Sequence, residues 1–242
     1  MIGIIGAMEE EVRILREELS DMKTDTRGDS EYYSGTLRGK EVVLLRSGIG
    51  KVQAAVGCTT LINMYSPSII INTGSAGGIN VYGSETFNIG DAIISTSLVQ
   101  HDFDITAFGY ARGQVPGRDS AYFPVEIGLV EKAITAVNNA RVDNQLPVSF
   151  KALPGLVATG DIFVSDSTHV LDLMHKFPGI RAVEMEGAAI AQTCVLFKVP
   201  FIVLRCISDI ANEKSPMSFD EYLPIAAKHS SEIVKRFIEI LE

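Results

Sequence analysis

The sequence has few of the residues that build metal sites or disulfide frameworks. Its three cysteines, Cys58, Cys194 and Cys206, are odd in number, lie in apolar segments and form no CxxC pair. We therefore expect reduced core cysteines in a cytoplasmic protein. The four histidines lack the HExxH or HxH spacing that is typical of metal ligands. We expect no metal ion and no other cofactor.

Clusters of basic residues are also missing. The formal net charge is −9, and the chain contains no run of lysines and arginines. A partner with closely spaced phosphates needs such clusters, so we exclude nucleic acid and an anionic membrane surface as partners. The first residues, MIGIIGAMEEEV, are apolar over a short stretch only and continue into acidic residues. They predict a first strand rather than a signal peptide or a membrane span.

Three common catalytic loops lack key residues. In LRSGIGKV, Leu45 stands at the first glycine position of a P-loop and Val52 at its Ser/Thr position. In GIIGAM, Ile5 replaces the second glycine of a dinucleotide-binding turn. In TGSAGG, Thr73 replaces the first glycine of a serine-nucleophile elbow. The sequence therefore disfavours phosphate-loop, dinucleotide and serine-nucleophile chemistry.

Short β-branched runs alternate with longer amphipathic stretches along the chain. The runs predict strands at residues 2–7, 42–48, 68–74, 91–100, 155–161, 181–185 and 200–208. The stretches predict helices at residues 9–19, 51–65, 168–177, 186–197 and 220–241. This alternation predicts a three-layer α/β/α fold with a mixed, mostly parallel central sheet. We expect one domain, residues 1–242, because α/β chains of this length commonly form a single core.

Polar residues follow several of the predicted strands, at the edge of the sheet where ligands of open α/β folds bind. They are Glu11, Ser75, Glu184, Glu186 and Asp209. Each one alone could be a helix cap or part of an acidic first turn. Together they suggest acid/base chemistry at a sugar carbon, where one group protonates the leaving group and another activates water. The one weakly patterned segment, residues 101–124, is long for an α/β connection and is typical of a functional loop.

The chain resembles the bacterial 5′-methylthioadenosine/S-adenosylhomocysteine nucleosidases, which belong to the purine nucleoside phosphorylase superfamily. The blocks that carry the resemblance are GIIGAMEEEV, SGIGKVQAA, IINTGSAGG, HDFDITAFGYARGQVPG, VEMEGAAIAQ, RCISDIAN and SFDEYLPIAAK. The resemblance runs nearly end to end. It implies a nucleoside phosphorylase-like fold, a role in methionine salvage and hydrolysis of the N-glycosidic bond of methylthioadenosine and S-adenosylhomocysteine, with 5′-deoxyadenosine as a further candidate substrate.

The resemblance also implies roles for the acids. Glu11 matches the general base that polarises water, and Asp209 matches the general acid that protonates adenine N7. Glu186 matches the carboxylate that binds the ribose hydroxyls. Glu184 either contacts ribose as well or fixes the turn between strand and helix through backbone amides. Ser75 is similar to the residue that supports the water and Glu11.

Further residues match the family's substrate contacts. Phe163 resembles the residue that stacks on adenine, and the backbone of Val164 would read the edge of the base. The apolar residues that would hold the 5′-alkylthio group are Met8, Ile49, Met185 and Phe219. In the family, an aromatic loop reaches the partner subunit's site, which implies a homodimer and such a role for Ile105, Phe108, Tyr110 and Pro116.

Three other functions stay open. A phosphorolytic nucleoside phosphorylase would need cationic donors for phosphate, whereas the turn GAMEEEV supplies three carboxylates. A futalosine-type nucleosidase would have similar base and ribose sites, so the sequence separates it poorly. A non-enzymatic nucleoside sensor would need neither a base nor an acid beside the bond.

Overall fold

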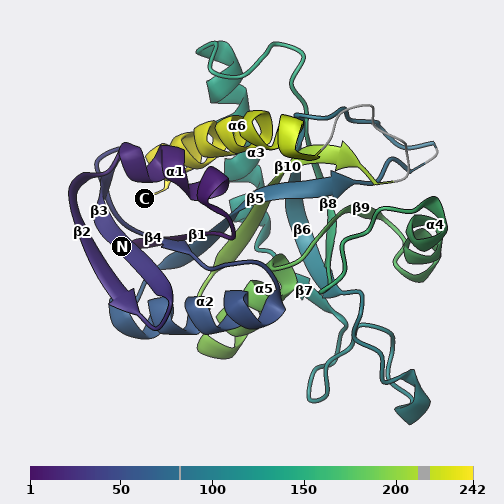
Figure 1. The fold of residues 1–242 in the computed structure, drawn as a ribbon. Helices are drawn as coiled ribbons and strands as arrows, with labels where there is room; N and C mark the ends of the chain where they lie inside the picture. The colour runs from purple at the N-terminus through teal and green to yellow at the C-terminus, as the bar shows by residue number, and fades with distance from the viewer. Residues whose placement is uncertain (82, 212–218, 242) are drawn as a thin grey trace.

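The computed structural model describes residues 1–81, 83–211 and 219–241, the last segment without the side chains of residues 219 and 220 (Figure 1). Its strands are β1 (Ile2–Gly6), β2 (Ser20–Arg27), β3 (Ser30–Leu37), β4 (Lys40–Arg46), β5 (Ile69–Gly78), β6 (Ala92–Gln100), β7 (Tyr122–Pro124), β8 (Ala152–Thr159), β9 (Ile180–Glu184) and β10 (Phe201–Ile210). Its helices are α1 (Glu9–Glu17), α2 (Lys51–Tyr65), η1 (Thr106–Phe108), α3 (Ile127–Val142), α4 (Ser167–Lys176), α5 (Gly187–Phe197) and α6 (Phe219–Ile240).

The strands of the described residues form one mixed sheet. Its order is β10-β6-β8-β9-β5-β1-β4-β3-β2, with β7 added to β6. Parallel pairs join β1 to β4 and β5, β5 to β10, β8 to β6 and β9, and the other pairs are antiparallel. Because β10 pairs with β5 as well as β6, the strands β5, β9, β8, β6 and β10 close into a ring. The predicted fold class is confirmed.

Helices cover both faces of this sheet. Helices α1, α3 and α6 lie on one side, and α2 and α5 lie together on the other (Figure 1). Strands that are covered on both faces need apolar residues at every position, which explains the continuous runs in the sequence. In β1, for example, all five residues from Ile2 to Gly6 are buried.

The buried side chains form two apolar clusters. The larger one fills the space between the sheet and the helices α1, α2, α3, α5 and α6. The smaller one lies between α4 and the strands β8 and β9, and we call it the α4 cluster. It includes Val164, Val170, Leu173 and Phe177. Val164 matters for the site because it anchors the segment between β8 and α4.

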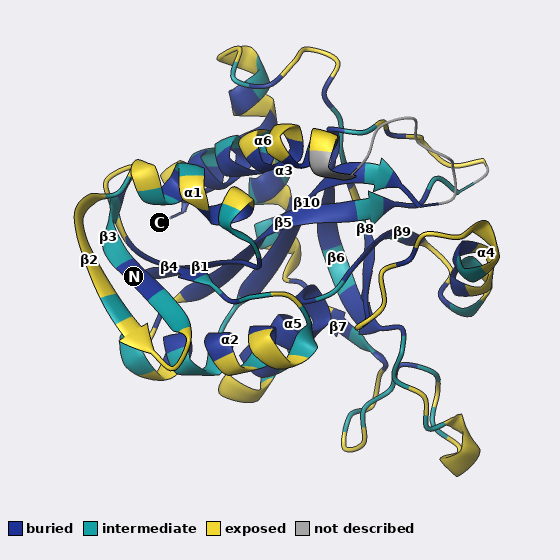
Figure 2. Ribbon diagram, viewed as in Figure 1, coloured by how far each residue is buried: buried dark blue, intermediate teal, exposed yellow. Residues whose placement is uncertain are grey.

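The predicted strands and helices occur at the expected places, but the hairpin β2–β3 and the helix α3 were not predicted. The segment 101–124 contains η1 and β7 and is otherwise loop. It projects from the sheet and is largely exposed (Figure 2). No helix in the described part of the chain is long and apolar enough to cross a membrane.

Candidate active site

A pocket with an empty volume of about 690 Å³, part of it open to solvent, lies at the carboxyl ends of β1, β5, β9 and β10. The predicted site residues that line it are Met8, Glu11, Ile49, Ser75, Phe163, Val164, Glu184, Met185, Glu186 and Asp209. The other lining residues are Ala7, Ala76, Gly77, Ile162, Val183 and Ser208. The strand topology therefore brings together acids that are as much as 198 positions apart in the sequence, Glu11 and Asp209.

Glu11 is buried at the start of α1 and accepts hydrogen bonds on both carboxylate oxygens. Its Oε2 accepts from the backbone N–H groups of Ala7, at 2.8 Å, and Met8, at 3.1 Å. Its Oε1 accepts from the Ser75 N–H, at 2.9 Å, and from the Ser75 hydroxyl, at 3.1 Å. Donors on both oxygens fix the carboxylate in one orientation, and the N-terminus of α1 favours its negative charge. The predicted pairing of Ser75 with Glu11 is present.

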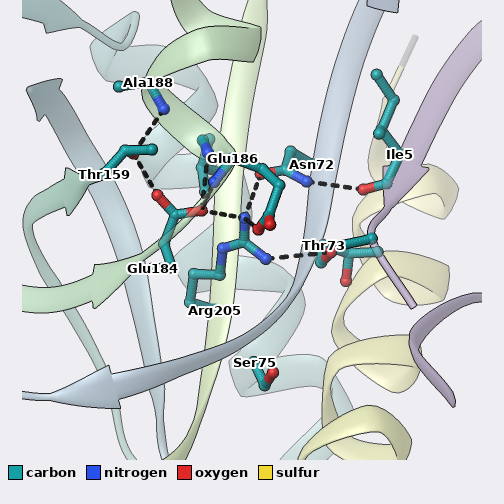
Figure 3. A network of polar contacts seen from close by, with 12 residues as sticks. Ile5, Asn72, Thr73, Ser75, Thr159, Glu184, Glu186, Ala188 and Arg205 are labelled. Carbon is teal, nitrogen blue, oxygen red and sulfur yellow. Dashed lines mark hydrogen bonds and ion pairs between the residues drawn. The ribbon is translucent and has the colours of Figure 1, made fainter. Parts of the chain in front are cut away.

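Arg205 is the buried cation beneath the pocket (Figure 3). Its Nη2 donates to Asn72 Oδ1 at 2.7 Å, pairs closely with Glu184 and lies 3.5 Å from Glu186 Oε2. Burial alone would lower the pKa of the guanidinium, but the carboxylates of Glu184, Glu186 and Glu11 outweigh it and raise that pKa above its ordinary value. Arg205 is therefore held as a charged group that compensates buried acids.

The contacts of Glu184 favour one of its two predicted roles. Its Oε2 accepts from the backbone N–H groups of Glu186, at 3.0 Å, and Gly187, at 2.7 Å, besides pairing with Arg205. Its Oε1 accepts from the Thr159 hydroxyl, which itself accepts from the Ala188 N–H at 2.7 Å. These partners fix the turn from β9 into α5, so Glu184 has little capacity left for a ligand.

Glu186 differs because its partners are few. Its Oε1 accepts from the Gly50 N–H at 2.9 Å, and among the described residues its Oε2 has only the 3.5 Å contact with Arg205. Burial, followed by repulsion from Glu184, raises the pKa of Glu186 to about 7, although Arg205 and the Gly50 N–H act in the opposite direction. A carboxylate with unused lone pairs in a pocket suits a ligand that brings its own hydroxyl donors.

Asp209 faces the pocket because β10 is irregular at this point. The register against β5 shifts between Ile207 and Asp209, which leaves Ser208 as an extra residue. Such a bulge re-aims the following side chain. Burial raises the pKa of Asp209, while the Ser208 hydroxyl, which donates to Asp209 Oδ1 at 3.0 Å, acts to lower it. A carboxyl group with a raised pKa can hold a proton closer to neutral pH.

The apolar residues form the rim of the pocket. Phe163 is 60% exposed and Ile49 is 51% exposed, whereas Val164 is 5% exposed and packs in the α4 cluster. Met8 and Met185 are half-buried. The side chain of Phe219 lies outside the described residues, so its predicted contact is not tested.

The loop residues Ile105, Phe108, Tyr110 and Pro116 do not line this pocket. Phe108 is 80% exposed and lies in η1. Their predicted role concerns a partner subunit, and it stays a prediction.

Four contributors were not predicted. They are Arg205, Ser208, Asn72 and Thr159. An arginine inside the apolar run FIVLRCIS is the one available signal, because a buried charge requires partners. The structure also explains the glycine at position 74, because a side chain there would collide with both Arg205 and Glu11.

Comparison with known proteins agrees with this arrangement. A family model described as Phosphorylase superfamily matches residues 1–239. The chain is 48% identical over 240 residues to a 5′-methylthioadenosine/S-adenosylhomocysteine nucleosidase of Anoxybacillus flavithermus, covering 99% of this chain and 98% of the relative.

Solved structures agree as well. The crystal structure of such a nucleosidase from Neisseria meningitidis, in complex with methylthio-immucillin-A, is 41% identical with a TM-score of 0.91 and 99% coverage of both chains. A futalosine hydrolase of Helicobacter pylori is 32% identical with a TM-score of 0.87, covering 99% of this chain and 97% of that one. The chain belongs to the phosphorylase superfamily, in the family of the 5′-methylthioadenosine/S-adenosylhomocysteine nucleosidases.

Proposed function

We propose that residues 1–242 form a single catalytic domain that hydrolyses the N-glycosidic bond of 5′-methylthioadenosine and S-adenosylhomocysteine. The products are adenine and a thioribose sugar, as methionine salvage requires. One observation carries the proposal: the pocket is lined by Glu11, Glu184, Glu186 and Asp209, and by no lysine or arginine among its described residues. Such a lining suits a transition state with positive charge on the sugar.

Two of the acids divide the chemistry. Glu11, oriented by Ser75 and two backbone amides, takes a proton from a water that attacks the anomeric carbon. Asp209, whose pKa is raised by burial, protonates adenine N7 as the bond breaks. The electron pair of the glycosidic bond leaves with the base, and the water oxygen forms the new bond to carbon.

The other residues bind substrate. Glu186 accepts hydrogen bonds from the ribose hydroxyls, Phe163 stacks on adenine, and the backbone of Val164 reads the edge of the base. The 5′-alkylthio group contacts the apolar side chains of Met8, Ile49, Met185 and Phe219.

We also propose a homodimer. Exposed apolar side chains on the neighbouring helices α2 and α5, namely Val52, Val56 and Leu196, are each at least 62% exposed, and so is Phe108. Exposed apolar side chains support an interface where they form one surface, as on two neighbouring helices. In the dimer, Ile105, Phe108, Tyr110 and Pro116 close the partner subunit's pocket. The three buried free cysteines are consistent with a reducing, cytoplasmic compartment.

The test is incubation of the purified protein with methylthioadenosine in phosphate-free buffer, followed by chromatography of base and sugar. We expect free adenine and free methylthioribose at a rate that added phosphate does not raise. Strict dependence on phosphate, or a sugar 1-phosphate product, would establish a phosphorylase instead. Futalosine is offered in parallel, because a futalosine hydrolase is among the similar structures. Tight binding of either nucleoside without turnover would identify a sensor.

A further inference from the structure

We propose that Lys51, Asp102 and Asp161 form a positioning ring that holds the lip of the pocket, residues 161–164, in its binding geometry. The inference rests on the proposed function, because it assigns residues that act on substrate binding through Phe163 and Val164. None of the three ring residues lines the pocket.

The ring consists of three contacts that return to their starting residue. The backbone N–H of Lys51 donates to Asp161 Oδ1 at 2.8 Å. The backbone N–H of Asp161 donates to Asp102 Oδ2 at 2.9 Å. The other oxygen of Asp102 accepts from the ammonium group of Lys51 at 2.6 Å. The three residues come from the start of α2, the loop after β6 and the lip, so the ring connects three separate parts of the chain.

The ring also supplies a cap that α2 lacks locally. Its N-cap residue is Gly50, and no acidic residue occurs in its first turn. The first N–H groups are satisfied from a distance, Gly50 by Glu186 and Lys51 by Asp161. The N-terminus of a helix favours carboxylates, so both acids are drawn to it. Glu186 lines the proposed ribose side of the pocket. Asp161 begins the lip that contains Phe163, on the proposed adenine side.

Burial strengthens the ion pair of the ring. The side chains of Lys51 and Asp102 are only 19% and 16% exposed. Burial acts to raise the pKa of Asp102, but the hydrogen bonds from Lys51 and Asp161 and the charge of Lys51 outweigh it and lower that pKa. Lys51 also donates to Gln100 Oε1 at 3.2 Å, which limits its rotation. The ring is therefore better ordered than an exposed surface pair.

The lip is fixed at its two ends. At one end, Gly160 lies against the buried imidazole of His101, where a larger residue would collide. The next residue, Asp161, is held by the positioning ring. At the other end, Val164 packs in the α4 cluster. Between them, Ile162 and Phe163 are 45% and 60% exposed. Loss of the ring would loosen the end of the lip that precedes the stacking residue.

The first experiment measures the lip without reference to activity. Amide hydrogen exchange of residues 161–163 is compared between the wild type, Asp102→Ala and Lys51→Met. Both variants remove the ion pair, and Asp102→Ala also removes the acceptor of the Asp161 N–H. We expect exchange to rise on the order of tenfold in Asp102→Ala, as for one hydrogen bond to a charged group, and less in Lys51→Met. Unchanged exchange in both variants overturns the ring.

The second experiment measures binding and turnover. In Asp102→Ala we expect the Kd for adenine and the KM for methylthioadenosine to rise on the order of tenfold, with kcat within about threefold of the wild type. Asp102→Asn keeps one acceptor oxygen and should recover part of the affinity. The control is Asp172→Ala, which removes an exposed carboxylate that pairs with Lys176 on α4. A fall in kcat with unchanged KM, or an equal effect of the control, contradicts a positioning role.

A double variant tests whether the two charged residues act as one unit. If Lys51 and Asp102 belong to one ring, Lys51→Met adds little to Asp102→Ala, and the adenine Kd of the double variant stays within about threefold of that of Asp102→Ala. If the increases in the adenine Kd caused by the two substitutions multiply in the double variant, Lys51 and Asp102 make independent contacts, and the proposed ring is wrong. A wild type that binds adenine but hydrolyses neither nucleoside would refute the proposed function, while the exchange and adenine measurements still decide on the ring.

Discussion

Glu186 should make the protein less stable as the pH rises, and Glu186→Gln should remove this dependence. In the folded protein the pKa of Glu186 is raised to about 7 by burial and by repulsion from Glu184, against an ordinary value of 4.5. Between these values the folded state holds a proton that the unfolded state releases. The folded state is therefore favoured at low pH, and this advantage is lost as the pH rises to 7.

The size of the effect follows from the two pKa values. A difference of about 2.5 pKa units, at about 1.36 kcal/mol each, sets an upper limit of roughly 3.4 kcal/mol. Between pH 5 and pH 8 the same values give a loss of roughly 2.5 kcal/mol in the free energy of unfolding. Glutamine resembles the protonated acid and does not titrate. The stability difference between the variant and the wild type should therefore grow by about this amount from pH 5 to pH 8.

The assay is urea unfolding at pH 5, 6, 7 and 8, at one protein concentration, for the wild type, Glu186→Gln and Glu41→Gln. Glu41 is an exposed carboxylate of β4 away from the pocket and serves as the control. Groups that titrate equally in all three proteins cancel in the comparison. If the unfolding free energies of wild type and Glu186→Gln change in parallel with pH, the acid is not protonated in the folded state and the electrostatic argument fails.

Three further predictions concern the reaction. Glu11→Gln keeps the acceptor for Ser75 but cannot take a proton, so kcat should fall by about 10² to 10⁴ while adenine binding, measured by calorimetry, persists. Asp209→Asn should lose a similar factor on methylthioadenosine but much less on a nitrophenyl riboside, whose leaving group needs no proton; equal losses in the two rate assays would make Asp209 structural. Phe108→Ala should raise the KM for methylthioadenosine about tenfold or more, and that for adenosine less, because burying an aromatic ring is worth roughly 1.5 to 3 kcal/mol; an active monomer in sedimentation would contradict this.

The strands of the core could be predicted because burial on two faces leaves a plain signal in the sequence. Runs such as IGIIG and SIIIN have no other good explanation in a chain of this length, and they identified β1 and β5. The hairpin β2–β3 was not predicted, because β2 is almost entirely exposed and its sequence, SDMKTDTR, has no alternation of apolar residues. Helix α3 did leave a signal, since Val130, Ala133, Val137 and Ala140 recur at helical spacing and are buried.

The candidate site was predictable as a set of acids but not as a network. Parallel strands bring their carboxyl ends to one edge, so Glu11 and Asp209 could be placed near one another before any coordinates. Glu186 joins them although β9 pairs antiparallel with β5, because the two strands meet at the carboxyl end of β5. The partners of these acids depend on register and burial. The bulge at Ser208 and the pairing of Arg205 with Glu184 follow from how β10 sits between its neighbours, and no local pattern encodes either. The positioning ring also depends on the fold, because it joins Lys51 to Asp102, 51 positions away, and Asp102 to Asp161, 59 positions away.

The balance of charge in the pocket explains why a buried arginine need not make a phosphate site. Arg205 is engaged by Glu184, Asn72 and the Thr73 carbonyl, and it does not line the pocket. With Glu11 and Glu186 added, the group around it stays negative even when Glu186 is protonated, because two carboxylates then face one guanidinium. A negative site repels phosphate but stabilises a sugar that becomes positive as its bond to the base breaks. Removing Glu184 would weaken this effect, because Arg205 would lose its nearest carboxylate and the group would become less negative. We therefore expect Glu184 to favour water over phosphate as the nucleophile through its pairing with Arg205, without contacting the substrate.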